Sequence, residues 1–473
     1  MNDALVKLKQ RQIIIAISLC CLVALTIPVM PHPVVILVFG LLPIGVWFVL
    51  RQAVLVVILF IAFSFFRIHE AIPVIMPFKF PLLLALGSLF VVAVRLILTR
   101  TMQIEWTREL TFLTIFFVLV TIGILFSKNK DIGFEYWKST YIKIYIMTLA
   151  GFWMLEYEKH FKLLMSIILV SGLIVSAVAI SNKLNGIGLV EETRVTIGRS
   201  FGSSLGDPND LALVLLFPFA YTLSMLLQSD QAKSIRFAAL IITGMLAMAI
   251  LFTQSRGGLL GMVGVSGYFG YQRVKSKVLL FSVGSLALLV LFAVAGVDDR
   301  ATTASVEDSA LDASALGRLH AWEAAWYMAL DNPFLGVGLS NFYNNYFFYT
   351  RHWDGLNHAV HSTWFSVMAE TGLVGFIIFV TLIILLFKKA FFLKHRLLPT
   401  HSPSLQALSH AAPAGIVGFI ISGTFLTQAF TWPLYLQIII ILSLHRFLNA
   451  PSQNENASSS TNANRNHLNQ TKL

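Results

Sequence analysis

Long runs of apolar residues, separated by short polar breaks, recur along almost the whole chain. The runs are roughly 16 to 22 residues long, the length a helix needs to cross the hydrocarbon core of a bilayer. Barrel strands would instead alternate over about ten residues, whereas stretches such as 13–28 and 375–387 are apolar on every face. The pattern predicts an all-α, polytopic bundle with fourteen spans, at 13–30, 33–50, 52–66, 80–98, 110–126, 139–155, 161–181, 209–228, 236–254, 257–272, 277–296, 363–387, 412–428 and 432–447.

Twelve spans are the alternative. Segment 52–66 is short for a span, and the pair of apolar runs after Ala412 also fits a re-entrant hairpin. Either number describes an integral membrane helical bundle with one long outer loop.

The composition supports a membrane protein and gives it an orientation. Of 473 residues, 57% are hydrophobic and 12% are charged, which excludes a water-soluble globule. With the N-terminus inside, 21 of the 34 Lys and Arg residues fall in inner loops, so both termini are expected in the cytoplasm. The net charge of +11 is therefore a signal of topology and gives no indication of nucleic-acid binding.

The two ends of the chain add little chemistry. Cys20 and Cys21 are adjacent inside the first predicted span and cannot cross-link an outer domain. Residues 450–473 are rich in Asn, Ser and Gln, which predicts a disordered cytoplasmic tail.

Polar residues gather in two outer loops. The first, from Ser181 to about Pro208, carries five polar residues that are candidates for substrate binding or helix capping. The second spans 297–361 and is the only long extramembrane segment, so soluble-side chemistry is expected there. The candidates in the first loop are Arg194, Arg199, Asp207, Asn209 and Asp210.

An amphipathic helix is predicted in the long loop over Ser314–Leu330. Its apolar positions recur every three or four residues, and it ends before Pro333. Arg318 and Trp322 share a face four residues apart. Either the helix lies on the bilayer with Arg318 paired to a lipid phosphate or a loop acid, or Arg318 faces a cavity as an anion ligand. The apolar positions are Leu319, Trp322, Trp326 and Leu330.

Arg256 lies at the junction of two predicted spans, where a guanidinium is costly unless it is paired or solvated. It precedes Gly257 and Gly258, which open the next helix. An arginine beside glycine amides at a helix N-terminus suits a phosphate or diphosphate. Snorkelling of the side chain to the interface is the alternative.

His361 begins the span that follows the long loop, with Glu370 on roughly the same helix face. The histidine is either a structural hydrogen-bonding group or a proton acceptor. Glu370 either caps a neighbouring helix or pairs with a buried arginine. Because the spacing of His352, His358 and His361 matches no strong zinc pattern, no metal site is expected.

Four segments resemble the O-antigen ligase and polymerase superfamily. They are Thr253–Gly258 (TQSRGG), Gly317–Trp322 (GRLHAW), Asn332–Phe342 (NPFLGVGLSNF) and His361–Gly375 (HSTWFSVMAETGLVG), and they occur in that order at the predicted outer face. The stretch Gly206–Asp210 is also similar to one found in some members. Members often carry His-Asn where this chain has His361-Ser362.

The resemblance implies a GT-C-like glycosyltransferase of the bacterial inner membrane. Its donor would be an undecaprenyl-diphosphate-linked glycan, used on the periplasmic side without metal or cofactor. In such a family two arginines hold the diphosphate and a histidine acts as base, which here implies Arg256, Arg318 and His361. Residues assigned to substrate binding are Arg194, Arg199, Asp207, Asn209, Trp322 and Glu370.

The resemblance also divides the chain into four parts. Helices occupy 1–180, a ligase-like core occupies 181–387, and further helices occupy 388–449 before the tail at 450–473. The favoured acceptor is lipid A core, as part of lipopolysaccharide biosynthesis. A repeat-unit polymerase and a protein O-oligosaccharyltransferase are alternatives with the same chemistry, whereas a lipid-linked-glycan flippase or a structural scaffold would be a different class.

Overall fold

The computed structural model describes residue 18 and residues 43–100, 102–294, 310–398 and 401–449. Within these ranges the protein is almost entirely helical. The first part contains α3 (Ala53–Phe66), α4 (Ile68–Ala71), η2 (Pro73–Phe78), α5 (Phe80–Ala93), η3 (Val94–Leu98), α6 (Arg108–Phe126), α7 (Lys130–Tyr136), η4 (Trp137–Tyr141), α8 (Ile142–Met154) and α9 (Glu158–Leu184). The second part contains β1 (Leu189–Val190), β2 (Arg194–Val195), η5 (Arg199–Phe201), η6 (Ser204–Gly206), α10 (Pro208–Leu227), α11 (Lys233–Thr253), α12 (Arg256–Arg273), α13 (Lys277–Val294), α15 (Ala310–Asp331), α16 (Phe342–Tyr349), α17 (Thr363–Phe392), η7 (Leu393–Arg396), α18 (Pro403–Gly423) and α19 (Trp432–Asn449).

The protein is a polytopic helical membrane protein. Seven of the described helices are long and apolar enough to cross a membrane. The number becomes eight if the helix Pro43–Arg51 and α3, which are bent by 92° at their junction, form one span. The predicted spans at 13–30 and over most of 33–50 lie outside the described residues. Helices α8, α12, α13 and α19 occupy other predicted positions but are shorter or less apolar.

Position inside the bundle explains why some of these helices are less apolar. In α19, every residue from Pro433 to Leu444 is buried by protein, including the polar Gln437. A helix surrounded by other helices does not need an apolar side facing lipid. Helix α18 begins at Pro403, nine residues before the predicted start at 412. Its polar first turns are also largely buried by protein, so they do not need an apolar surface that faces lipid.

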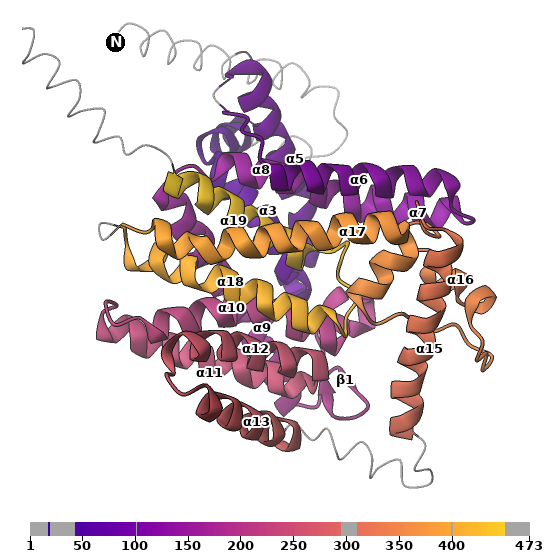
Figure 1. The fold of residues 1–473 in the computed structure, drawn as a ribbon. Helices are drawn as coiled ribbons and strands as arrows, with labels where there is room; N and C mark the ends of the chain where they lie inside the picture. The colour runs from indigo at the N-terminus through magenta and orange to yellow at the C-terminus, as the bar shows by residue number, and fades with distance from the viewer. Residues whose placement is uncertain (1–17, 19–42, 101, 295–309, 399–400, 450–473) are drawn as a thin grey trace, which may run out of the picture.

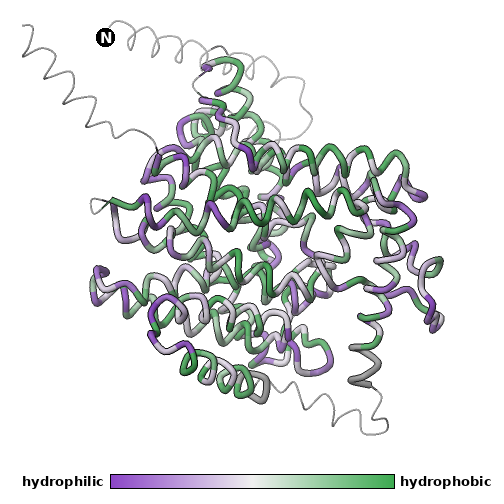
Figure 2. The backbone as a smooth tube through the Cα atoms, viewed as in Figure 1, coloured by the Kyte–Doolittle hydropathy of each residue, from purple (hydrophilic) through white to green (hydrophobic). Residues whose placement is uncertain are grey.

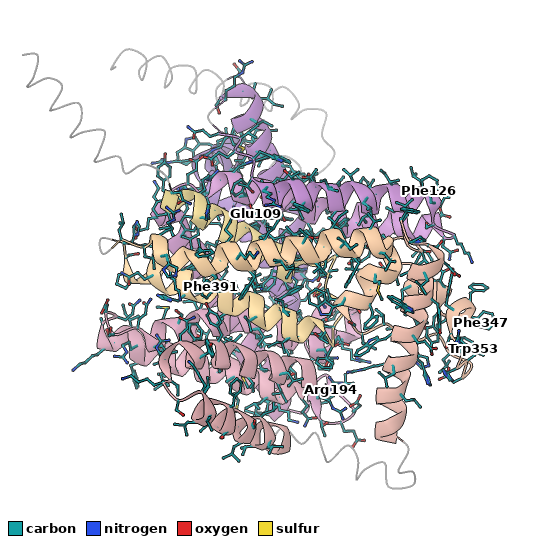
Figure 3. All side chains as sticks on the ribbon, in the orientation of Figure 1. Glu109, Phe126, Arg194, Phe347, Trp353 and Phe391 are labelled. Carbon is teal, nitrogen blue, oxygen red and sulfur yellow. The ribbon has the colours of Figure 1, made fainter. Side chains whose placement is uncertain are left out.

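The long helices run side by side, and hydrophilic segments gather mainly at their ends (Figures 1 and 2). Helix α10 packs against α11, α12 and α18, and α17 packs against α6. Near one end, Lys389 Nζ donates to Glu109 Oε2 across α17 and α6 at 2.6 Å. Figure 3 shows Glu109 and Phe391 toward this end, with Phe126, Phe347 and Trp353 at the opposite end.

Helix α15 lies across the end that carries Phe126 and Trp353, steeply inclined to the long helices (Figure 1). The sequence predicted this helix and its apolar stripe, but not the face that packs against the bundle. Small residues around Met328 are buried against α17 and α16. Of the predicted apolar stripe only Trp322 turns inward, whereas Leu319, Trp326 and Leu330 are 55%, 44% and 46% exposed. An exposed apolar stripe on a helix at the end of a bundle suits contact with a bilayer surface.

Candidate functional site

A short β-hairpin that the sequence did not predict positions Arg194. Strands β1 and β2 pair antiparallel, with Val190 opposite Arg194. The guanidinium donates to the Asn209 side-chain oxygen at 2.9 Å and to the Thr253 carbonyl at 3.2 Å. Its side chain is 11% exposed and also approaches Glu191 at 3.6 Å. Arg194 therefore joins the hairpin to the start of α10 and the end of α11.

Asp207 caps the N-terminus of α10. Its carboxylate accepts hydrogen bonds from the backbone N–H groups of Asn209 at 2.7 Å and Asp210 at 3.4 Å. Pro208 occupies the first helical position, where its fixed φ and missing N–H cost nothing. The sequence Asp-Pro-Asn-Asp is thus a helix start, and it places Asp207 and Asn209 at the same end of the bundle as Arg194.

Arg256 is the first residue of α12. Ser255 caps this helix by accepting from the Gly258 N–H at 3.1 Å. Gly258 lets α12 approach α10, because a Cβ there would meet the Ala212 Cβ at 2.5 Å. The preceding Gln254 has φ of +50°, so the chain turns sharply between α11 and α12. This local geometry puts a guanidinium at a helix N-terminus, where the helix dipole also favours an anion.

The loop before α17 holds His361 through its neighbours. Trp322 Nε1 donates to the Val360 carbonyl at 2.9 Å, and its ring stacks on Phe365 with centroids 5.0 Å apart. Thr363 donates to the Leu426 carbonyl and accepts from the Gln428 N–H at 3.1 Å. His361 itself has φ of +44°, a conformation that is uncommon outside glycine. Trp322 thus positions the histidine from the side of α15.

Electrostatic coupling brings five predicted site residues into one group. Burial lowers the pKa of Arg318, and the nearby charges of Arg256 and Arg194 lower this pKa further. Burial also lowers the pKa of Arg194, to which Arg256 contributes in the same direction. Burial and then the charge of Arg318 lower the pKa of His361, while Asp207 opposes this shift. We call Arg194, Arg256, Arg318, Asp207 and His361 the arginine cluster.

The arginine cluster carries excess positive charge. Three guanidinium groups lie with two carboxylates, Asp207 at the start of α10 and Glu191, which is exposed beside Arg194. Three like charges held together under partial burial repel one another unless an anion joins them. The arrangement can therefore bind a ligand with several negative charges, next to an imidazole that stays neutral at neutral pH.

Glu370 contacts the backbone before α16 and is not part of the arginine cluster. Its carboxylate accepts from the Ser340 N–H at 2.8 Å, just before α16 begins, and only 7% of the residue is exposed. Of the two alternatives raised by the sequence, capping of a neighbouring helix is the one observed. Its assignment to substrate binding stays a prediction without a described contact in its favour.

The segment Asn332–Phe342 fits into a break in α17. Gly372 has φ of +72° and ψ of −177° inside the helix. The freed backbone groups are satisfied by this segment: Val337 N–H donates to the Ala369 carbonyl at 2.9 Å, and Val374 N–H donates to the Pro333 carbonyl at 3.2 Å. The break gives the first turns of α17, which follow His361, a direction different from the rest of the helix (Figure 1).

Arg199 lies outside the arginine cluster in the contacts described. Its guanidinium donates to the Gly206 carbonyl at 3.2 Å and so closes the loop before α10. Arg67 and Glu70 were not among the predicted site residues, although a cluster of charges right after an apolar run is a signal for such residues. Arg67 pairs with one carboxylate oxygen of Glu70. Ser203, which lies in the loop before α10 together with Arg199, donates to the other oxygen.

The histidines of the long loop contact an aspartate and another histidine. His358 lies 2.7 Å from Asp354, and His352 stacks on His320 with centroids 3.9 Å apart. Within the described ranges, no three His, Cys, Asp or Glu side chains are grouped so that they could hold a metal ion.

A family model described as O-antigen ligase matches residues 211–380, which contain Arg256, Arg318 and His361. No curated protein matches the chain.

Proposed function

We propose that this protein transfers a glycan from an undecaprenyl-diphosphate carrier to an acceptor hydroxyl on the periplasmic face of the inner membrane. The match of residues 211–380 to a family model described as O-antigen ligase supports this proposal. The family comprises ligase- and polymerase-type membrane enzymes, and it implies lipid-linked glycan substrates. The observation that carries the proposal is the arginine cluster, which joins three guanidinium groups to a half-buried histidine at one end of the bundle.

The chemistry follows from these groups. The acceptor oxygen attacks the anomeric carbon as the bond from that carbon to the diphosphate oxygen breaks, which inverts the anomeric centre. His361 takes the proton of the acceptor hydroxyl. Arg256 and Arg318 stabilise the charge on the departing diphosphate, and Arg194 adds a third positive charge. Since these guanidinium groups supply the positive charge, the proposed reaction requires no divalent metal.

Lipid A core is the acceptor we favour. A polymerase that uses a second lipid-linked repeat, and an enzyme that modifies a protein, would share the same chemistry. A flippase would place its ionisable groups along a path through the bilayer, whereas the arginine cluster gathers beside the starts of α10, α12 and α17.

The proposal is tested with Arg256→Ala in membranes that contain the lipid-linked donor. Loss of one preorganised donor to a developing negative charge costs about 10²–10³-fold in rate. We therefore expect transfer to fall by that factor while the protein level on an immunoblot stays unchanged. Arg273→Ala is the matched control, because Arg273 ends the same helix and donates to the Leu227 carbonyl at 3.1 Å. Normal transfer by Arg256→Ala would reject the assignment.

A deletion strain separates the acceptors. Loss of all attached polymer from lipopolysaccharide indicates a ligase, and attachment of single repeats indicates a polymerase. Lipopolysaccharide with normal polymer, together with an unglycosylated protein, would identify a protein acceptor.

A further inference from the structure

A cavity lined in part by α10 lies at Asp210, three residues after Asp207 of the arginine cluster. It has a volume of about 570 Å³ and lies between α3, α5, α8 and α10 and the segment that joins α18 to α19. This volume falls within the roughly 300–1,000 Å³ usual for small-molecule sites. None of the residues assigned to the proposed reaction lines it. We call it the lateral cavity.

The walls of the lateral cavity combine aromatic rings with hydroxyl groups. Phe60, Phe65 and Trp432 provide ring surface. The hydroxyl groups come from α3, α7, η4, η6 and the segment that joins α18 to α19. A cavity for lipid tails would not need them. Rings that stack on sugar faces, next to hydroxyl groups that exchange hydrogen bonds, suit a carbohydrate. The hydroxyl-bearing residues are Ser64, Tyr136, Ser139, Thr140, Ser204 and Thr431.

Two cations and one carboxylate, Asp210, line the lateral cavity, and this excess of positive charge favours an acidic ligand. Lys143 is exposed, and the described residues contain no ion pair with it. Arg67 pairs with Glu70, yet its Nε is buried without a hydrogen-bond partner among the described residues. Arg67 also has φ of +50°, and strained backbone of this kind collects at binding sites.

The lateral cavity reaches the arginine cluster through two residues. Asp210 and Gln428 both line it, and the Gln428 side-chain amide donates to the Asp210 carboxylate. On the cluster side, Asp210 follows the cap residue Asp207 by three positions, and the Gln428 N–H donates to Thr363, two residues after His361. Asp210 and Gln428 therefore connect the cavity to the segments that carry Asp207 and His361.

We propose that the lateral cavity binds the acceptor glycan, and that this glycan carries a phosphate or carboxylate held by Lys143 and Arg67. The inference rests on the proposed transfer reaction and identifies its second substrate as an acidic sugar. The acceptor hydroxyl forms the new bond to the anomeric carbon, its proton passes to His361, and the electron pair of the broken bond leaves with the diphosphate. Asp210 and Gln428 act as positioning residues between the two substrates.

The test uses the full-length protein in membranes, with lipid A core as the acceptor probe. The probe is supplied intact, or with its phosphates removed and its carboxylates methylated. Lys143→Gln removes a cation from the lateral cavity, and Ala85→Phe fills the cavity from α5 without changing charge. Lys138→Gln is the matched control, since Lys138 is exposed one turn earlier and does not line the cavity.

We expect Lys143→Gln to raise the KM for the intact acceptor about tenfold and to leave the KM for the neutralised acceptor unchanged. Ala85→Phe should reduce use of both acceptors. Binding of the lipid-linked donor should stay normal in both variants, whereas Arg256→Ala should weaken it. The inference is overturned if both cavity variants behave like Lys138→Gln, or if they lose donor binding. Failure of the proposed function is a different result, in which the wild type itself transfers no glycan to either acceptor.

Discussion

His361 combines features that a proton acceptor requires. Trp322 and Thr363 fix the chain on either side of it. Burial and the positive charge of Arg318 keep the pKa of the imidazole below its usual value of 6.5. The neutral form therefore predominates at neutral pH and can accept a proton from a hydroxyl. The positive charge that we propose for diphosphate binding would thus also keep the proposed base unprotonated.

The pH dependence of transfer follows from this arrangement. Activity should be constant above neutral pH and fall as pH drops through the lowered pKa of His361, because protonation removes the base. Asp207 is the neighbour that raises this pKa. Asp207→Ser removes the negative charge and keeps a side chain that can cap α10. The pKa of His361 then falls further, so we expect the acid limb of the rate profile to move to lower pH.

The measurement is the initial transfer rate between pH 5 and 8 at saturating donor. Asp131→Asn serves as control, because Asp131 is exposed in the first turn of α7 and is not among the charges that act on His361. An acid limb that stays in place in Asp207→Ser, or moves to higher pH, would contradict the role of Asp207.

At the scale of elements, the break in α17 joins the long loop to the membrane bundle. The segment Asn332–Phe342 supplies backbone donors to the carbonyls of Ala369 and Glu370, and it accepts from Val374. Glu370 binds the N–H of Ser340 in return. These contacts hold the loop, and with it the end of α15, in a fixed position relative to the helix that follows His361.

Gly372 is the residue on which the break depends. Its φ and ψ fall in a region essentially restricted to glycine. A Cβ there would also meet the Pro333 oxygen at 2.5 Å and the Asn332 oxygen at 2.7 Å. We expect Gly372→Ala to lower the free energy of unfolding by at least about 2 kcal/mol and to reduce transfer. Thermal unfolding in detergent measures the first effect.

Gly244→Ala provides the comparison. Gly244 lies within α11, and an added Cβ there meets nothing within 4 Å. Alanine is the better helix former by roughly 0.5–1 kcal/mol, so this variant should be as stable as the wild type or more stable. Equal melting temperatures for the two variants would show that the break is not held by Gly372.

The sequence predicted the helices that span the bilayer better than the elements that pack mainly against other parts of the protein. Apolar runs located α6, α9, α10 and α11 because length and hydropathy alone identify a helix that can span a bilayer. The β1–β2 hairpin has only two residues in each strand and gave no alternating pattern. The face of α15 that packs on α17 was not predicted, because buried alanines make this contact and they do not stand out as an apolar stripe.

The candidate site was predictable residue by residue but not as an arrangement. Arg256 and His361 stood out because each lies at the end of an apolar run, where charge is expensive. That Arg194, Arg256 and Arg318 act on one another depends on how α10, α11, α12 and α15 pack, which no local spacing encodes. The contacts of Arg67 with Glu70, of Glu70 with Ser203 and of Asp210 with Gln428 join segments far apart in the sequence or lie within a turn, and the sequence predicted none of them.

On the scale of the whole molecule, the two ends of the bundle differ in chemistry. One end carries the arginine cluster, α15 and the lateral cavity. The other carries a basic pocket of about 320 Å³ that includes Lys388, Lys389 and Arg396, with Glu109 as its acidic member. Because cytoplasmic segments retain Lys and Arg, the basic pocket is expected to face the cytoplasm. The arginine cluster would then face outward.

Cysteine labelling tests this orientation directly. After Cys20 and Cys21 are replaced by serine, single cysteines are introduced as Arg351→Cys, beside α16, and His395→Cys, in η7. Both positions are exposed. A membrane-impermeant maleimide applied to intact spheroplasts should label Arg351→Cys and should label His395→Cys only after the membrane is permeabilised. The reverse pattern would put His361 and the arginines in the cytoplasm, where a periplasmic glycan donor cannot reach them, and the proposed reaction would be untenable.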